Sequence, residues 1–236
     1  DAEPGLDWDL WLGPAPMRPY DHILSPRGVH NHFPMWRNYR EYGGGMVTDW
    51  GAHHLDITQW GLGADDSGPV EVIPPDGWEK AQAGAKLKYA NGVEVKHVSE
   101  NGVTFFGSDG EVYVNRGKFK LTLKGEEKAK FVAKEDKPSL NEQLDKVEKE
   151  YLANAKVKLY ASTDHKQDFL DAIKKRSRPI CDVEIGARSV IACHLANLAY
   201  YHGKKFQWDP AKNDFANGGG EAKWLTREYR GNWKVA

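Results

Sequence analysis

The sequence has no hydrophobic run close to the ~20 residues that a helix needs to cross a bilayer, and it opens with no charged-then-apolar leader. It also lacks an excess of either charge, because 33 basic and 34 acidic residues leave a formal net charge of -1. Without a basic surplus there is no field to gather nucleic acid or an anionic membrane, so we expect neither as a partner. These absences do not decide whether the protein stays in the cytoplasm or is exported to the periplasm.

Cysteine is scarce, with only two among 236 residues. Cys181 and Cys193 form no C-x-x-C motif and have no repeated Cys/His spacing around them. This pattern favours buried free thiols over a disulfide or a metal pair.

Motifs for nucleotide binding are missing as well. The turn Gly43-Gly44-Gly45 precedes a predicted helix, but Thr48 stands where G-x-G-x-x-G requires its third glycine, and Gly218 to Gly220 opens no βαβ unit. A phosphate-binding loop and a nucleophile elbow are also absent. We therefore expect no pyrophosphate site in this chain.

The patterns that are present predict an α+β fold. Periodic apolar residues and end signals indicate helices at about 48 to 62, with Thr48 as N-cap, at 163 to 175 and at 183 to 202. Short β-type runs lie between Val70 and Leu123, with Asn91-Gly92 and Asp109-Gly110 as hairpin turns. Because no regular β-α-β alternation occurs, we expect one large, mostly antiparallel sheet with helices on one face.

Composition divides the chain further. Residues 1-45 read as an arm rich in aromatic residues, proline and glycine, and residues 46-236 as the α+β domain for substrate binding and oligomerisation. Within that domain, the Lys- and Glu-rich residues 124-160 predict a charged, solvated excursion, and residues 210-236 a C-terminal tail.

The helix predicted at 48 to 62 carries the clearest candidate site. Asp49, His53, Asp56 and Trp60 recur at i, i+4, i+7 and i+11, which places them in one stripe. An imidazole one turn from a carboxylate is typical of acid-base chemistry. The same spacing also fits three structural polar residues, or a zinc or manganese site completed by His30 or His32.

The aromatic arm has two interpretations. Its rings could stack on the C–H faces of a sugar, with Arg18, Arg37 and Arg40 as polar contacts, or they could anchor the arm to the surface. The rings in question are Trp8, Trp11, Tyr20, Trp36, Tyr39 and Tyr42.

At this point the residues resemble a known family. The run GGGMVTDWGAHHLDITQW is similar to the glycine-rich turn and D-x-G-x-H-x-x-D-x-x-x-W helix of the glucose-fructose oxidoreductase / inositol dehydrogenase (Gfo/Idh/MocA) enzymes. The segments LDWDLWLGPAP, HKQDFLDAIKKRSRPICDVEIGARSV and AYYHGKKFQWDP extend the likeness over nearly the whole chain. The resemblance is to the C-terminal substrate domain of these enzymes.

The resemblance implies a catalytic pair, Asp49 and His53, acting on a sugar or polyol hydroxyl. At the substrate we expect a further set of residues, and no metal: Trp36, Arg37, Tyr39, Trp50, His54 and Asp56. NAD or NADP would bind a Rossmann domain that is lost or separate, so no cofactor is expected on this chain alone. The lysine of the family's E-K-P motif has no counterpart here.

The resemblance further implies a homo-oligomer that covers the open face of the sheet. Two other functions stay open at the level of the sequence. One is a stand-alone carbohydrate-binding or scaffold protein without redox activity. The other is a metal-dependent hydrolase or lyase that uses Asp49, His53 and Asp56.

Overall fold

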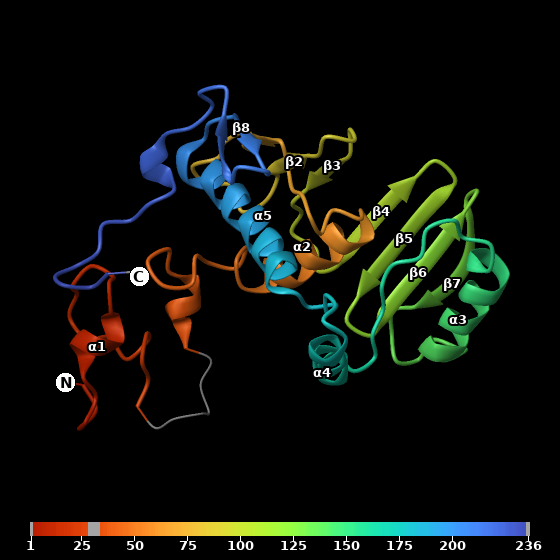
Figure 1. Ribbon diagram of the computed structural model, residues 1–236, viewed down its shortest axis with the longest axis horizontal. Coiled ribbons are helices and arrows are strands. Elements are labelled where there is room, and N and C mark those ends of the chain that lie inside the picture. The colour runs from red at the N-terminus through yellow and green to blue at the C-terminus, as the bar shows by residue number, and fades with distance from the viewer. Residues whose placement is uncertain (1, 28–33, 235–236) are drawn as a thin grey trace. The chain divides into compact units, whose positions relative to one another are not determined.

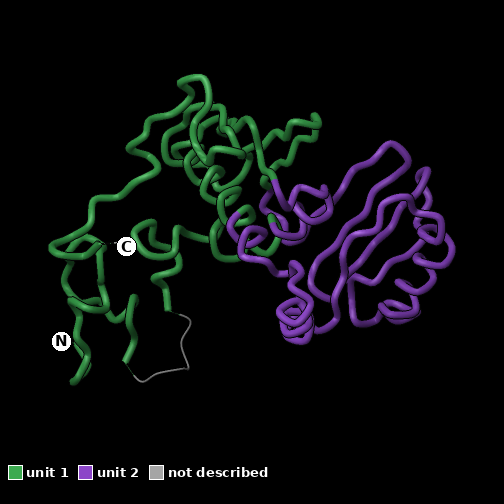
Figure 2. Tube along the Cα trace, viewed as in Figure 1, with its two compact units in different colours: residues 1–55, 67–97, 188–236 green, residues 56–66, 98–187 purple. Residues whose placement is uncertain are grey.

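The computed structural model describes residues 2–27 and 34–234, which fold into two units (Figures 1 and 2). Unit 1 comprises residues 1–55, 67–97 and 188–236, and unit 2 comprises residues 56–66 and 98–187. All strand pairs among the described residues are antiparallel. The predicted α+β class is confirmed.

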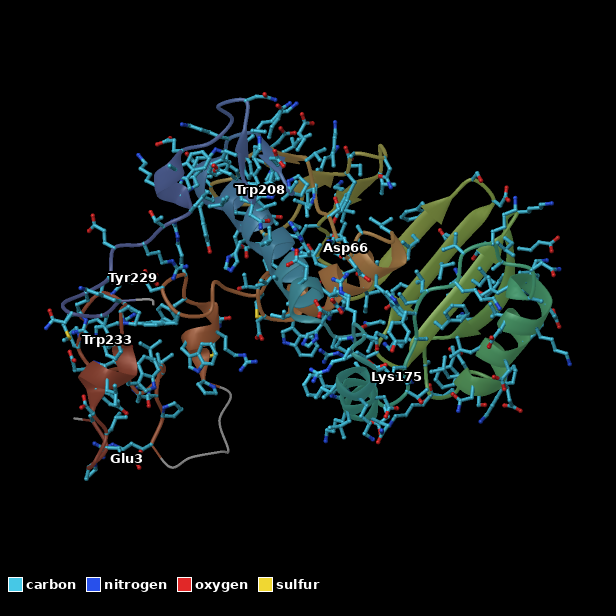
Figure 3. All side chains as sticks on the ribbon, in the orientation of Figure 1. Glu3, Asp66, Lys175, Trp208, Tyr229 and Trp233 are labelled. Atoms are coloured by element: carbon cyan, nitrogen blue, oxygen red, sulfur yellow. The ribbon has the colours of Figure 1, made fainter. Side chains whose placement is uncertain are left out.

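Unit 1 contains a five-stranded sheet in the order β3-β2-β1-β8-β9 (Figure 1). Its strands are β1 (Glu71–Ile73), β2 (Lys86–Lys88), β3 (Glu94–Lys96), β8 (Phe206–Asp209) and β9 (Asp214–Ala216). Val72, Leu87 and Phe206 are buried, while the lysines and glutamates that alternate with them are not. Trp208, labelled in Figure 3, adds a second buried ring from β8.

Helix α5 (Val183–His202) supplies much of the remaining core of unit 1. The hydroxyl of Tyr200 accepts a hydrogen bond from the Ala85 backbone N–H at 3.1 Å and lies 2.6 Å from Nδ1 of His97. These contacts tie α5 to the ends of β2 and β3. Three short helical segments complete the unit: α1 (Trp8–Leu12), η1 (Met35–Asn38) and η3 (Ala222–Trp224).

Unit 2 contains a four-stranded sheet in which neighbours in sequence are neighbours in space. Its strands are β4 (Val103–Gly107), β5 (Gly110–Asn115), β6 (Lys118–Leu123) and β7 (Glu126–Phe131), followed by α3 (Leu140–Val147), the π-helical η2 (Glu148–Leu152) and α4 (His165–Lys175). Val147 of α3 packs on Phe119, Leu121 and Ala129. One face of this sheet is therefore covered by α3.

The division into two sheets corrects the prediction of one large sheet. After β3, the backbone N–H of His97 still donates to the Ala85 carbonyl, but Ser99 to Gly102 form bends and Gly102 adopts a φ of 118°. Such a backbone cannot continue a ladder, so the strands after it start a new sheet.

The helix boundaries lie close to those predicted, since α2 (Trp50–Gly61), α4 and α5 occupy the three expected segments. Thr48 is not the N-cap, because its hydroxyl donates to the carbonyls of Gly43 and Gly45 instead. The predicted excursion at 124 to 160 is also more regular than expected: β7 is an edge strand, and α3 begins with a capping box of Ser139 and Glu142.

The predicted arm and tail contain buried residues and regular elements. Leu12 and Leu24 of the predicted arm are buried, and the predicted tail contains β9 and η3. Among residues 2–27 and 34–234, no helix combines the length and apolarity that a membrane span requires.

Candidate functional site

The candidate site begins at the glycine turn, Gly43 to Gly45. The backbone N–H groups of Gly43 and Gly44 donate to the Tyr39 carbonyl at 3.1 and 3.0 Å, and that of Gly45 donates to the Arg37 carbonyl at 2.9 Å. Gly44 and Gly45 have φ values of 80° and 87°, in the region that glycine adopts without steric cost. The turn therefore folds back on the segment that carries Arg37.

The turn is anchored to α5. The side-chain amide of Asn197 donates to the Gly44 carbonyl at 2.8 Å, and the Tyr201 hydroxyl donates to the same oxygen at 3.3 Å. Asn197 is buried, and the guanidinium of Arg40 lies 4.0 Å from the centre of the Tyr201 ring. A buried amide needs a partner, and here that partner is the glycine turn.

Arg37 and Asp49 form a bidentate ion pair. Nε of Arg37 lies 2.7 Å from Oδ2 of Asp49, and an Nη lies 2.9 Å from Oδ1. The two side chains are 28% and 19% exposed. The hydrogen bonds to Asp49 raise the pKa of Arg37 above its ordinary value, so this guanidinium stays charged.

His53 lies one turn further along α2 and is exposed. Its ring centre is 6.2 Å from that of Trp50, at an interplanar angle of 67°, and Trp50 is 40% exposed. The imidazole and the indole edge thus share one stretch of surface, beside the half-buried His54. Asp49, predicted to orient His53, is instead held by Arg37.

Trp36 and Tyr39 lie on the segment that leads into the glycine turn. The guanidinium of Arg37 is 5.4 Å from the Trp36 ring centre, so Trp36 is close to the ion pair. The Tyr39 ring is 5.2 Å from the Arg18 guanidinium and 6.1 Å from the Tyr42 ring. The structure therefore brings Trp36, Arg37 and Asp49 together.

Asp56 belongs to unit 2. It is exposed. The pKa of the Asp65 carboxyl is raised mainly by the burial of Asp65 and, to a lesser extent, by the negative charge of Asp56. Asp66, labelled in Figure 3, is bound by Arg178 in the same unit. Trp60, the last residue of the predicted stripe, donates from its indole to the Tyr160 carbonyl at 3.1 Å. The last two residues of the stripe, Asp56 and Trp60, thus lie in unit 2.

The aromatic rings of the arm contact one another. Trp8 and Trp11 stack with ring centres 4.6 Å apart, Tyr20 meets Trp8 at 5.1 Å, and Tyr42 meets Trp11 at 5.4 Å. Of the two interpretations of the arm, this packing favours rings as anchors.

Metal ligation finds no support among the described residues, which contain no group of three His, Cys, Asp or Glu side chains suited to hold an ion. His30 and His32, the possible additional ligands, lie outside the described residues. Both cysteines are free, as predicted, but Cys181 is exposed and only Cys193 is buried. Cys181 is exposed because it lies in the irregular segment between α4 and α5, and not within a packed helix.

A cavity of about 550 Å³ lies within unit 2. It is lined by the second half of α4, by the segment before α5, and by Val183. None of the predicted site residues lines this cavity. The chemistry predicted for α2 therefore gains no support from it.

Sequence reasoning missed Asn197 and Tyr201. An asparagine among the apolar residues of a helix that is mostly buried was the available signal, since buried polar side chains almost always bind something specific. Its partner is the backbone carbonyl of Gly44, and the sequence alone does not indicate which backbone carbonyl a side chain will bind.

Within residues 2–27 and 34–234, two antiparallel sheets and their helices define a mixed α/β domain that contains no parallel, doubly wound sheet. Residues 2–235 match the family described as oxidoreductase family, C-terminal alpha/beta domain, in its Gfo/Idh/MocA form. The chain belongs to this family, which confirms the resemblance seen in the sequence.

No curated protein matches the sequence. Among solved structures, the chain is similar to an oxidoreductase-type protein from Thermotoga maritima, with 16% identity and a TM-score of 0.45. The likeness covers 75% of this chain and 51% of that one, so the chain spans about half the length of that protein.

Proposed function

We propose that this domain is the substrate-binding and catalytic half of an NAD(P)-dependent oxidoreductase that acts on a sugar or polyol. The observation that carries the proposal is the exposed His53 imidazole beside the Trp50 ring, near the start of a helix preceded by the Arg37–Asp49 ion pair. Family membership supplies the oxidoreductase class.

The chemistry assigned to His53 is proton transfer. A positioned imidazole can take the proton of a substrate hydroxyl and return it in the reverse direction. Trp50 offers an exposed ring nearby, and sugars present C–H faces that pack on such a ring. This pairing favours a carbohydrate or polyol over an apolar substrate.

The glycine turn does not fit the pyrophosphate of NAD or NADP. A pyrophosphate needs free backbone N–H groups at a glycine-rich turn and helix start. In the glycine turn, the N–H groups of Gly43, Gly44 and Gly45 already donate to the carbonyls of Tyr39 and Arg37. We therefore propose that the cofactor is held by a separate nucleotide-binding domain.

The decisive experiment replaces His53 in the longest protein that the gene encodes. His53→Ala should lower kcat by roughly 100-fold or more, the scale of a lost acid-base group, and leave the dissociation constant of NAD or NADP unchanged. His165→Ala, at an exposed histidine of α4, is the matched control and should retain full turnover.

Unimpaired turnover of the His53 variant would assign His53 a structural role. Sugar binding with no turnover in any variant would favour the stand-alone carbohydrate-binding protein instead.

We also propose a homo-oligomer through an open sheet face. In the five-stranded sheet, ion pairs join Lys86 to Glu94 at 3.0 Å, Lys88 to Glu71 at 3.3 Å and Lys205 to Glu71 at 2.7 Å. Such a ladder keeps an uncovered face soluble and could also pair with a second copy. Light scattering at tens of micromolar tests this, and a monomer there would contradict the proposal.

A further inference from the structure

We propose that Arg37 is a positioning residue that acts through Asp49, rather than a residue that contacts the substrate. This inference rests on the proposed function of His53. It assigns the glycine turn and Asn197 a role in the same site, as the support that fixes Arg37.

The first step is the geometry of the ion pair. Both carboxylate oxygens of Asp49 accept from Arg37, at 2.7 and 2.9 Å, and this two-point fork fixes both the position and the plane of the carboxylate. The Trp36 ring, 5.4 Å from the guanidinium carbon, adds a second restraint on Arg37. The fork takes up the Nε–H and one Nη N–H of Arg37, so the edge of the guanidinium that faces Asp49 is not available to a substrate.

The second step is the backbone of Arg37. Its carbonyl accepts the N–H of Gly45 at 2.9 Å, and a Cβ at position 43 would come within 2.8 Å of the Arg37 Cα. Only glycine at position 43 permits this approach. The turn therefore packs directly on the residue that carries the guanidinium.

The third step is the anchor of the turn. The Gly44 carbonyl accepts from the buried Asn197 amide at 2.8 Å and from the Tyr201 hydroxyl at 3.3 Å. A continuous path of hydrogen bonds thus runs from α5 through the turn and Arg37 to Asp49, the residue before α2. His53 lies four residues beyond Asp49, so this path sets where α2 presents the imidazole.

The consequence for catalysis is specific. If Arg37 acts by placing α2, its loss should lower kcat while the KM for the sugar changes little. If Arg37 contacted the substrate in ground and transition states alike, its loss would raise KM instead.

The test compares Arg37→Ala, Arg37→Lys and Asp49→Asn in the full-length protein. We expect Arg37→Ala and Asp49→Asn each to lower kcat by about tenfold, the scale of a lost hydrogen-bonded charge pair, with KM within about twofold. Arg37→Lys should recover only part of the loss, because an ammonium cannot form the fork. The double variant should be no worse than either single one, since the two residues act as one unit.

Arg178→Ala is the matched control, because Arg178 also pairs with aspartates but lies in unit 2. It should leave kcat and KM unchanged. A spectroscopic measurement on this chain alone needs no turnover: the Nε–H resonance of Arg37 should exchange slowly with water in the wild type and rapidly in Asn197→Ala and Asp49→Asn. The Arg178→Ala variant should leave that resonance as it is.

The outcomes separate the two proposals. A large loss with His53→Ala but none with Arg37→Ala, or a rapidly exchanging Nε–H in the wild type, overturns the positioning role and leaves the proposed function standing. If Arg37→Ala raises only KM, then Arg37 contacts the substrate and the positioning role is wrong. Full activity of the His53 variant would contradict the proposed function. The Nε–H measurement would still test whether the hydrogen bonds from α5 to the glycine turn hold Arg37 in place.

Discussion

Helices α5 and α4 differ in how they are stabilised. Helix α5 buries eight residues, among them Leu195, Ala196 and Leu198. In α4, Phe169, Leu170 and Ile173 are 54%, 51% and 48% exposed, and Ala172 is the buried residue. The fixed points of α4 are its ends: Asp164 accepts the N–H groups of Lys166 and Gln167 at 3.0 Å each, and Arg176 closes the helix in the left-handed region.

The difference shows that an apolar stripe in the sequence does not determine whether a helix is stabilised by burial or by its capping hydrogen bonds. Helix α5 has a sheet and a glycine turn to pack against within unit 1, so burial stabilises it and it can serve as an anchor. Helix α4 keeps its stripe exposed, so its capping bonds contribute a larger share of its stability.

The largest expected effect is in α5. Leu195→Ala removes a side chain that is 2% exposed, and we expect it to lower the free energy of unfolding by about 2 to 5 kcal/mol. Leu170→Ala in α4 makes the same chemical change at an exposed position and should cost less than about 1 kcal/mol. Chemical denaturation measures both. Equal losses would remove the distinction between the helices.

The next effect is at the N-terminus of α4. Asp164→Ala leaves two backbone N–H groups without their side-chain acceptor and should destabilise α4 by about 1 kcal/mol. Asp171→Ala, within the same helix, changes charge equally but removes only side-chain pairs and should cost a few tenths of a kcal/mol, roughly. Amide hydrogen exchange along α4 reports the difference, and similar exchange in the two variants would contradict the role of the cap.

The smallest effect is a pH dependence at His97, which bonds to Tyr200 of α5. Burial lowers the pKa of His97 below its ordinary value of 6.5. Because the unfolded chain then binds the proton more readily than the folded one, stability is fully present above that value and is lost as pH falls below it. Allowing for its partial exposure to solvent, the loss should stay below about 1 kcal/mol.

Thermal unfolding of the wild type and His97→Gln between pH 8 and 5 checks this sign. The variant should show a weaker dependence, with the remainder from His194 and His202, whose pKa values are also lowered by burial. A wild type that gains stability as pH falls would refute the assignment.

The sequence predicted the elements better than their partners. The runs from Val70 to Leu123 became strands because alternation and Asn-Gly or Asp-Gly turns are local signals. Val72 and Phe206 are far apart in the sequence, so the local pattern around either residue could not predict that they pair. The strand Glu126–Phe131 was missed because an edge strand with one covered face can be rich in lysine and glutamate.

The same limit applies to the site. The spacing of Asp49 and His53 was visible because a helix repeats every 3.6 residues. The partner of Asp49 was not, because Arg37 precedes an irregular turn whose path no periodicity describes. The pairing of the two residues depends on three glycines and on one asparagine of α5.

The discontinuous make-up of unit 1 has a consequence for the order of folding during synthesis. Strands β4 to β7 pair with their neighbours in sequence, so their ladders can close soon after each hairpin leaves the ribosome. The ladder between β1 and β8 must wait until β8 is made, and the glycine turn must wait for Asn197. The segment bearing His53 is therefore made early, but its anchor on α5 can form only after residues 188–236 have been made.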